Sequence, residues 1–396
     1  MTLADYSIIV PQIRILNAIM KQETNNDENH AIYHNDSGPI TLADEGKNIV
    51  EPWDGGDLFN DQGFVLRARS KTGEDVHLWC FMYQQRGRES IIDGDICQLL
   101  VVAPKLSEQE KAFMHPDVWT VNEGQGLEDY FKPGTLTSEE TKDKVIWKVE
   151  NVQFIATPPY WHVVGEKAGV KIDLRFEQYN PAFWHLGTFD KVKAQGIAGY
   201  IVHCRTNGTL VLDGKTLEFE NQFGLHERIL QKGYVPDRTG HMSGRGLHWM
   251  HGFSDGFSWY LIRGDVGKGM GTAMINVGDE QIHSQDASAC GVEEAQNWHD
   301  PESRTISAFR WRVWVRTSRG VLESRINAYG RQNYTWVRRG GTIIVTQYCA
   351  DAETEFRFND GKVVSSKQLI SIEHMRTFYR QISSLQNPGR EDHIFP

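Results

Sequence analysis

The stretch FVLRARSKTGEDVHLWCFMY, residues 64–83, decides the fold class. It contains two strand-like runs, Phe64–Arg69 and Val76–Tyr83, on either side of a turn at Lys71–Glu74, and this pattern predicts a β-hairpin. In the second run large side chains alternate onto both faces, and a strand that is apolar on both faces is buried on both. We expect one face to line a barrel interior, which can hold a ligand, and the other to lie in a domain interface.

The same pattern continues along the chain. Turn sequences occur at Asn207-Gly208, Asp213-Gly214 and Asp255-Gly256. Helical periods are confined to residues 1–20 and 366–385, so the helices that a βαβ fold needs between its strands are missing. The sequence therefore predicts an all-β protein of two packed antiparallel barrels, with a short N-terminal helix and a C-terminal helix. The further strand-like runs are residues 95–103, 145–155, 170–176, 200–205, 209–212, 217–219, 247–251, 257–263, 271–277, 305–315, 321–327, 334–338, 342–349 and 353–358.

The length of the chain supports two domains. A single hydrophobic core stops growing at about 250–300 residues, and the chain has 396. A glycine-rich loop with Pro236, at residues 232–246, separates two groups of strand-like runs. We therefore expect an N-terminal helix and polar loop at residues 1–40, a first barrel domain at 41–235, and a second barrel domain with the C-terminal helix at 236–396.

Composition limits the class of partner. A formal net charge of −10 argues against nucleic acid, which is bound through a concentrated basic face. The one basic run, Arg310–Arg316, is expected to be a strand with a solvated arginine face. No window approaches the roughly 20 apolar residues of a membrane span, and residues 1–20 lack the pattern of a secretory signal. Five cysteines, odd in number and without metal-binding spacing, favour free thiols in a reducing cytoplasm.

Ionisable residues concentrate between Phe223 and Trp259. In the strand-like run that begins at Phe223, His226 and Arg228 share one face and Glu227 lies on the other. A histidine that faces an apolar interior is a candidate general acid or base, whereas the ordinary role of a strand histidine is structural.

The next hairpin carries two further histidines. His248 and His251 fall on opposite faces of one strand, which is poor geometry for holding a single metal ion. Either can still meet His226 across strands, so a metal site formed by these three stays an alternative.

Several runs, in this order, resemble the tandem-lipocalin family. They are residues 147–154, 170–176, 200–203 and 210–214, closing on Phe223-Gly-Leu-His-Glu-Arg. The family includes carotenoid 1,2-hydratases (hydroxyneurosporene synthases), AttH-like proteins and, more distantly, tocopherol cyclases, kievitone hydratases and fungal Diels–Alderases. The resemblance covers roughly residues 55–360. The family usually has an acid before the histidine, and here the order is His226-Glu227.

The resemblance implies two lipocalin-like barrels with an aromatic-lined pocket between them. It implies a redox-neutral, cofactor-independent reaction on an apolar natural product, such as an isoprenoid or polyketide: hydration, dehydration, isomerisation or cyclisation. A carboxyl or histidine desolvated in an apolar cavity can supply the proton, and aromatic faces can stabilise a developing cation. The expected catalytic residues are His226 and Glu227, with His251 and Asp255 as partners. The expected substrate-binding residues are Trp79, His248, Trp249, Trp259 and Tyr260.

Three hypotheses for function follow. The first is the cofactor-free acid–base enzyme, the second a non-catalytic lipocalin-type carrier, and the third a metal-dependent hydrolase. Convergence of His226, Glu227, His248 and His251 on one cavity favours the enzyme, and a scattered, solvent-facing arrangement favours binding. The expected partner is an apolar small molecule, without nucleic acid or a membrane span, and a homodimer stays open.

Overall fold

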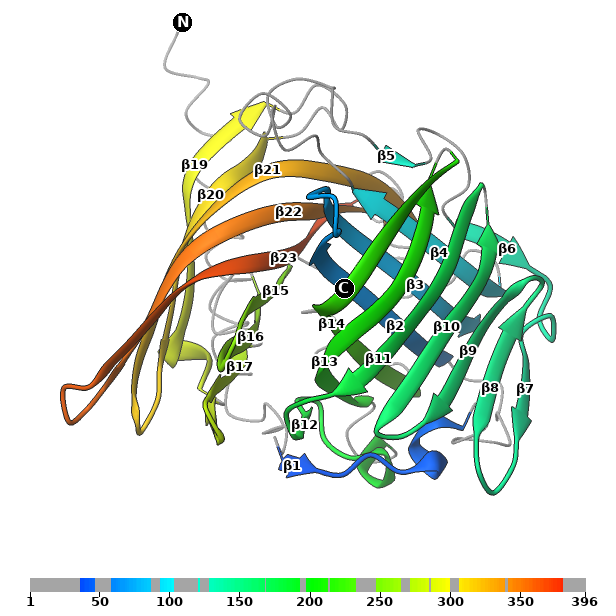
Figure 1. The fold of residues 1–396 in the computed structure, drawn as a ribbon, viewed down its shortest axis with the longest axis horizontal. Coiled ribbons are helices and arrows are strands. Elements are labelled where there is room, and N and C mark those ends of the chain that lie inside the picture. Colours follow the sequence, from blue (N-terminus) through cyan, green and yellow to red (C-terminus); the bar gives the residue numbers. More distant parts are fainter. Residues whose placement is uncertain are drawn as a thin grey trace, which may run out of the picture. The chain divides into compact units, whose positions relative to one another are not determined.

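Antiparallel strands form two large curled sheets (Figure 1). The computed structural model describes residues 36–46, 58–86, 93–102, 120–121, 128–167, 169–192, 197–212, 214–232, 247–264, 271–284, 286–299, 306–338 and 341–379. All of them belong to one unit, residues 33–396. The predicted helix at residues 1–20 lies outside the described residues, and no helix within the described part of the chain is long and apolar enough to cross a membrane.

The first sheet, drawn from blue to green in Figure 1, runs in the order β5-β4-β3-β2-β14-β13-β11-β10-β9-β8-β7. At its margins β12 pairs with β1 and β13, and β6 pairs with β4. Its strands are β1 (Asp36–Gly38), β2 (Leu58–Arg69), β3 (Asp75–Arg86), β4 (Gly94–Val102), β5 (Thr120–Val121), β6 (Glu128–Phe131), β7 (Thr137–Glu140), β8 (Val145–Val149), β9 (Val152–Thr157), β10 (Tyr160–Lys167), β11 (Val170–Gln178), β12 (Ala182–Trp184), β13 (Ile197–Leu212) and β14 (Lys215–Lys232).

The second sheet, drawn from yellow-green to red, runs in the order β18-β17-β16-β15-β23-β22-β21-β20-β19 (Figure 1). Three short 3-10 turns, η3 (Leu42–Glu45), η5 (Phe189–Lys191) and η6 (Ala287–Ala289), accompany the two sheets in the described residues. The strands of the second sheet are β15 (Leu247–Ser254), β16 (Phe257–Gly264), β17 (Gly271–Val277), β18 (Glu280–Ser284), β19 (Cys290–His299), β20 (Ile306–Arg316), β21 (Gly320–Arg338), β22 (Gly341–Phe358) and β23 (Val363–Tyr379).

Both sheets have the same main topology. In each, most strands that are consecutive along the chain lie side by side, and the last strand returns to pair with an early one. Thus β14 pairs with β2 in the first sheet, and β23 pairs with β15 in the second. The prediction of an all-β fold with two lipocalin-like antiparallel sheets is confirmed. The expected domain limits stay a prediction, and residues 233–246 lie between β14 and β15 outside the described residues.

Two local predictions were wrong. Residues 366–379 belong to strand β23 rather than to a C-terminal helix, because β23 is paired on both sides, with β15 and β22, and buries side chains on both faces. An apolar run of this kind does not distinguish helix from strand by its period. Asn207-Gly208 is a bulge inside β13 instead of a hairpin turn, and Gly208 has a φ of 137° there. The hairpin turns at Asp255-Gly256 and before Lys215 are present.

Buried apolar side chains form three clusters. One lies on the inner face of the first sheet and another on the inner face of the second. The third contains side chains from both sheets, and we call it the intersheet layer. Its members are Val65, Trp79, Phe81, Tyr83, Ile96, Leu100, Phe183, Leu186, Ile197, Ile201, Leu225, Ile229, Leu247, Trp249, Phe253, Tyr260, Ile262, Met274, Tyr334, Val345 and Met375.

Strand β3 takes part in two of these clusters. Leu78 and Cys80 pack in the first-sheet interior, whereas Trp79 and Phe81 pack in the intersheet layer. The prediction that one face of this strand lines a barrel interior and the other an interface is confirmed. The solvated arginine face of β20 is confirmed as well, because Arg310, Arg312 and Arg316 are exposed.

A buried arginine also joins the two sheets. Arg67 of β2 donates from Nε to the carbonyl of Ile370 and from Nη2 to the carbonyl of Ala350, each at 2.9 Å. Its charge is balanced by Asp75, which is also fully buried. A guanidinium in this position ties strand β2 to strands β22 and β23 and fixes the register between the sheets.

Candidate functional site

His226 points into the interior of the first sheet together with Arg228, with which the strand pattern predicted a shared face. Its Nδ1 lies 2.9 Å from the carbonyl oxygen of Gly63, and its Nε2 lies 3.1 Å from the hydroxyl of Tyr200 and 3.2 Å from Oε1 of Glu45. The ring stacks on Phe64 with centroids 4.4 Å apart. His226 therefore has polar partners at both ring nitrogens.

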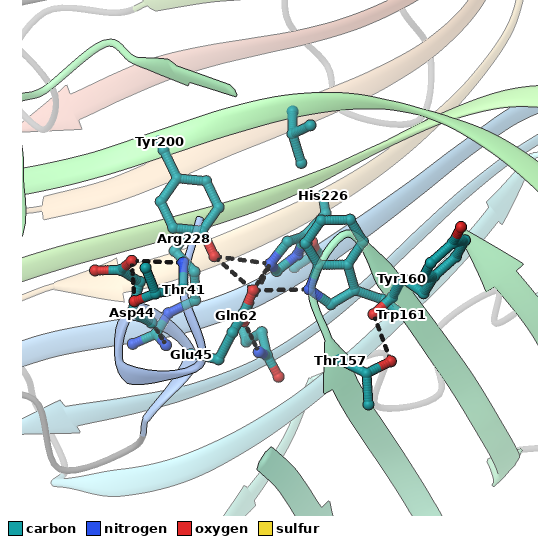
Figure 2. Close-up of polar contacts among 12 residues, drawn as sticks. Thr41, Asp44, Glu45, Gln62, Thr157, Tyr160, Trp161, Tyr200, His226 and Arg228 are labelled. Carbon is teal, nitrogen blue, oxygen red and sulfur yellow. Dashed lines mark hydrogen bonds and ion pairs between the residues drawn. The ribbon is translucent and has the colours of Figure 1, made fainter. Parts of the chain in front are cut away.

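Glu45 is the centre of this group, and the sequence analysis did not identify it (Figure 2). It is the last residue of turn η3, which is held by Asp44 accepting hydrogen bonds from the backbone N–H and hydroxyl of Thr41 at 2.8 and 2.7 Å. Trp161 donates to Oε1 of Glu45 at 2.7 Å and Tyr200 at 2.8 Å, and Gln62 donates to Oε2 at 2.5 Å.

The charge of Glu45 is compensated. Burial alone would raise its pKa, but the neighbouring His226 and Arg228 and the hydrogen bonds to His226 and Trp161 lower the pKa of Glu45 to about 2. Arg228 donates to the carbonyls of Asp44 and Gly46, and its guanidinium lies 4.8 Å from the ring centroid of Trp147. A carboxylate with every oxygen satisfied is the pattern of a structural clamp, here holding η3 inside the first sheet.

Glu227 faces the opposite way, into the intersheet layer. It is 3% exposed, and its Oε2 has no hydrogen-bond partner among the described residues. Burial, followed by the charges of Asp61 and Glu373, raises the pKa of Glu227 well above its ordinary value. Three carboxyl groups from β2, β14 and β23 thus share one desolvated region.

The two neighbouring carboxyls behave alike. Burial raises the pKa of Asp61, although the backbone N–H of Ile229 donates to it at 2.5 Å. Burial also raises the pKa of Glu373 to about 8, against hydrogen bonds from Gln347 and Tyr334. A carboxyl group whose pKa lies above 7 is protonated at neutral pH and can act as a proton donor.

Histidines from both sheets meet in the same layer. Nδ1 of His251 lies 3.2 Å from Nε2 of His203, and the other nitrogen of His203 lies 2.9 Å from the hydroxyl of Ser258. His77 of β3 lies 2.9 Å from the hydroxyl of Ser371 on β23. Burial is the largest cause that lowers the pKa of His77, His203 and His251, so these rings are neutral and can accept protons.

Aromatic side chains surround these groups. Tyr260 lies 5.0 Å from His251 and 5.7 Å from Trp249 by ring centroids, and His185 lies 5.4 Å from Tyr260. Burial and then the charge of Glu227 raise the pKa of Tyr260, so the tyrosine of β16 and the glutamate of β14 are electrostatic neighbours. Trp79 packs in the same layer and donates to Oε1 of Gln98 at 3.2 Å.

Five of these side chains carry buried polar atoms without a hydrogen-bond partner among the described residues. Buried polar groups are normally satisfied, so several orphans in one layer call for a physical explanation. In the first-sheet interior the oxygens of Glu45 are all used, and the atoms there without a partner among the described residues include Oε1 of Gln62 and Nε of Arg228. The orphaned atoms are Oε2 of Glu227, Nε2 of His251, the hydroxyl of Tyr260, Nε1 of Trp249 and both ring nitrogens of His185.

The predicted site residues therefore divide among separate places. Glu227, His251, Trp79, Trp249 and Tyr260 meet in the intersheet layer.

The other four predicted residues lie elsewhere. His226 lies in the first-sheet interior. His248 and Trp259 face the second-sheet interior, where Trp259 donates to Gln368 at 2.7 Å. The partner role expected for Asp255 was wrong, because Asp255 lies at the exposed turn after β15, with its side chain 88% exposed, and pairs with Arg205 at 2.5 Å.

Sequence reasoning missed four members of the layer. Asp61 lies just before the first predicted hairpin, Glu373 lies within the predicted helix, and His185 follows Trp184 in a stretch where no strand is predicted. Alternation within Tyr200–Arg205 places His203 on the same face as Ile201, which is the one signal that could have found it.

No family model and no curated protein matches the sequence. Solved structures do match. A Nitrosomonas europaea protein assigned as AttH is 11% identical with a TM-score of 0.54, covering 85% of this chain and 98% of its own. Kievitone hydratase from Nectria haematococca is 11% identical with a TM-score of 0.50, covering 87% and 95%. CghA solved with Sch210972 is 10% identical with a TM-score of 0.54, covering 81% and 88%. The chain therefore has the fold of the tandem-lipocalin proteins.

Proposed function

We propose that this protein is a redox-neutral, cofactor-independent enzyme that acts by acid–base catalysis on an apolar natural product. The reaction is a hydration or dehydration, an isomerisation or a cyclisation, and the substrate lies in the intersheet layer. The observation that carries the proposal is the set of orphaned polar atoms of Glu227, His251 and Tyr260 among apolar and aromatic side chains. A substrate with one or two polar groups would supply the partners that the protein does not.

The roles follow from protonation. Glu227, whose pKa is raised, is the proton donor, and His251, whose pKa is lowered, is the acceptor. At neutral pH the carboxyl of the donor is protonated and the imidazole of the acceptor is unprotonated. The reaction needs both, because one substrate atom gains a proton and another loses one. The faces of Trp79 and Trp249 can stabilise positive charge that develops on an apolar substrate. The name of kievitone hydratase, whose fold this chain shares, fits this class of chemistry.

A lipocalin-type carrier is the second candidate. It is favoured because His226 and His248 do not join Glu227 and His251. These residues are buried rather than solvent-facing, however, and the intersheet layer supplies acid and base groups without them.

Two measurements on the full chain test the proposal. Mass spectrometry of the gently purified protein identifies the retained small molecule. Incubation with that compound and its hydrated, dehydrated or isomeric forms then shows turnover as a mass change of one water, or as a new isomer of equal mass. We expect the variant Glu227→Gln to bind the compound and to lose turnover by about 100-fold or more, because general acid catalysis contributes about 10²–10⁴-fold.

The matched control is Glu323→Gln, which alters an exposed carboxylate paired with Arg312. It should turn over at the wild-type rate. Binding without turnover in the wild type would establish the carrier instead, and full activity of Glu227→Gln would remove the proposed acid.

A further inference from the structure

Two histidines lie side by side in the second-sheet interior. His248 of β15 and His374 of β23 are direct cross-strand neighbours, and their rings stack with centroids 3.9 Å apart and planes 16° from parallel. They share their face with Met250 and Ile372, which pack in the second-sheet interior, so both point away from Glu227 and the intersheet layer. Both are nearly fully buried, at 4% and 3% exposure.

A carboxylate from a distant strand reaches this pair. Oε1 of Glu294, on β19, lies 3.6 Å from Nε2 of His248 and 3.9 Å from Nδ1 of His374. A direct ion pair between imidazolium and carboxylate closes to about 2.7–2.9 Å, and these separations are longer. Two ligands about 2.1 Å from one tetrahedral metal ion are about 3.4 Å apart, which is near the observed spacing.

We propose that His248, His374 and Glu294 bind one divalent transition-metal ion. Their donor atoms all lie within 4.8 Å of one another, and they form the one such group of histidine, cysteine and acidic residues found in the described part of the chain. Two imidazole nitrogens and one carboxylate oxygen suit zinc or iron(II), and three protein ligands leave a position for water. The Glu294 side chain is 35% exposed, which gives the ion a route from solvent.

The site differs from the metal site that the sequence left open. His226 and His251 take no part, since they face the first-sheet interior and the intersheet layer. The neighbouring Arg263, cross-strand from His248, turns its guanidinium to the carbonyls of Cys290 and Gly264. Because its three ligands lie outside the intersheet layer, the ion would take no part in the reaction proposed for that layer.

The position of Glu294 suggests what the ion does. Strand β19 is an edge of the second sheet and also contacts β16 and β17, whereas β15 and β23 lie at the middle of the sheet. An ion held by all three strands would bind the edge strand to the centre of the sheet across the curl. It would stabilise the folded second sheet, because an ion that binds only the folded state adds to its stability.

The test is a zinc titration of the full-length protein after treatment with a chelator. We expect calorimetry to show one zinc ion per chain and the Tm to rise when zinc is added. Cobalt(II) bound in place of zinc should give the absorption spectrum of a four- or five-coordinate ion. Loss of an outer partner of a metal ligand already costs about 10–100-fold in affinity, so Glu294→Gln and His374→Gln should each weaken zinc binding at least about tenfold and abolish the rise of Tm.

The control is Glu293→Gln, the adjacent exposed carboxylate on the other face of β19, which should bind zinc as the wild type does. Equal zinc affinity in Glu293→Gln and Glu294→Gln would overturn the proposal, as would binding that never reaches one ion per chain. If His374→Gln fails to fold, the zinc affinity of Glu294→Gln, at a partly exposed position, decides alone. Turnover is measured separately, so failure here leaves the proposed reaction unaffected.

Discussion

Two consecutive residues of β14 show how burial gives ionisable groups opposite roles. His226 and Glu227 are both buried, at 0% and 3% exposure. His226 has polar partners at both ring nitrogens, including the carboxylate of Glu45, whereas Glu227 keeps an unsatisfied oxygen beside two other carboxyls. A buried charge is tolerated when it is paired and hydrogen-bonded, and an unpaired acid stays neutral instead. The first arrangement stabilises the fold, and the second provides a proton.

The variant Glu45→Gln should destabilise the protein. Removing one of two interacting buried charges leaves the other, here the guanidinium of Arg228, uncompensated and costs about 3–5 kcal/mol. The folded-state pKa of Glu45, about 2, lies below its unfolded value of 4.5, so the stabilisation is present above pH 4.5 and is lost as the pH falls from 4.5 to 2. Urea denaturation across this range should show wild-type stability falling with pH and a flatter profile for Glu45→Gln.

The matched control is Glu139→Gln, which changes an exposed carboxylate of β7 and should retain the wild-type profile. A Glu45→Gln protein as stable as the wild type at pH 7 would show that the clamp has no structural role.

At the scale of the strand, alternation predicted far more than local propensity did. The two faces of β3 and the opposite faces of His248 and His251 followed from a period of two, and the hairpin at Gly256 followed from its turn sequence. Strand β23 and the bulge at Gly208 did not, because pairing partners distant in sequence decide both. A strand enclosed between two neighbours needs no alternation of polar and apolar residues, and its pattern resembles that of a buried helix.

Gly63 of strand β2 leaves room for the ring of Phe81 on the neighbouring strand β3. A Cβ at Gly63 would lie 1.8 Å from Cε1 of Phe81, its cross-strand partner, which also stacks on Trp79. Gly63→Ala should therefore displace the Phe81 ring and lower the free energy of unfolding by about 1–3 kcal/mol. Urea denaturation measures the loss.

A double-mutant cycle with Phe81→Leu identifies the cause of that loss. The smaller side chain relieves the contact, so the two substitutions should be non-additive. Strict additivity would assign the effect to the backbone of β2 instead.

At the scale of the whole described unit, the sequence predicts only part of the intersheet layer. It predicted that acid, histidine and aromatic side chains meet, and Glu227, His251 and Tyr260 do. It could not bring Glu373 to them, because only the packing of one sheet on the other joins β23 to β14. Asp61 reaches Glu227 through the pairing of β2 with β14, which are distant in sequence. Periodicity assigns a residue to a face, and the topology decides what that face meets.

The same layer should make the protein sensitive to alkali. The folded-state pKa of Glu373, about 8, lies above its unfolded value of 4.5, so its contribution is present below pH 4.5 and is lost as the pH rises through 8. Glu373 alone accounts for about 5 kcal/mol over this range, in the same direction as Asp61 and Glu227. Glu373→Gln should gain stability relative to the wild type between pH 5 and pH 8 in urea denaturation. If the free energies of unfolding of Glu373→Gln and the wild type differ by the same amount at pH 5 and pH 8, this expectation is contradicted.

The closing strands have a consequence for how the molecule folds. Leu247 of β15 pairs with Met375 of β23, and most of the second sheet lies between them along the chain. Such a pairing forms slowly, because the loop must close before its contacts can contribute. Until then β15 and β22 both present unpaired backbone edges, which invite pairing with another chain. During refolding at high protein concentration, aggregation should therefore compete with the pairing of β23 with β15 and β22.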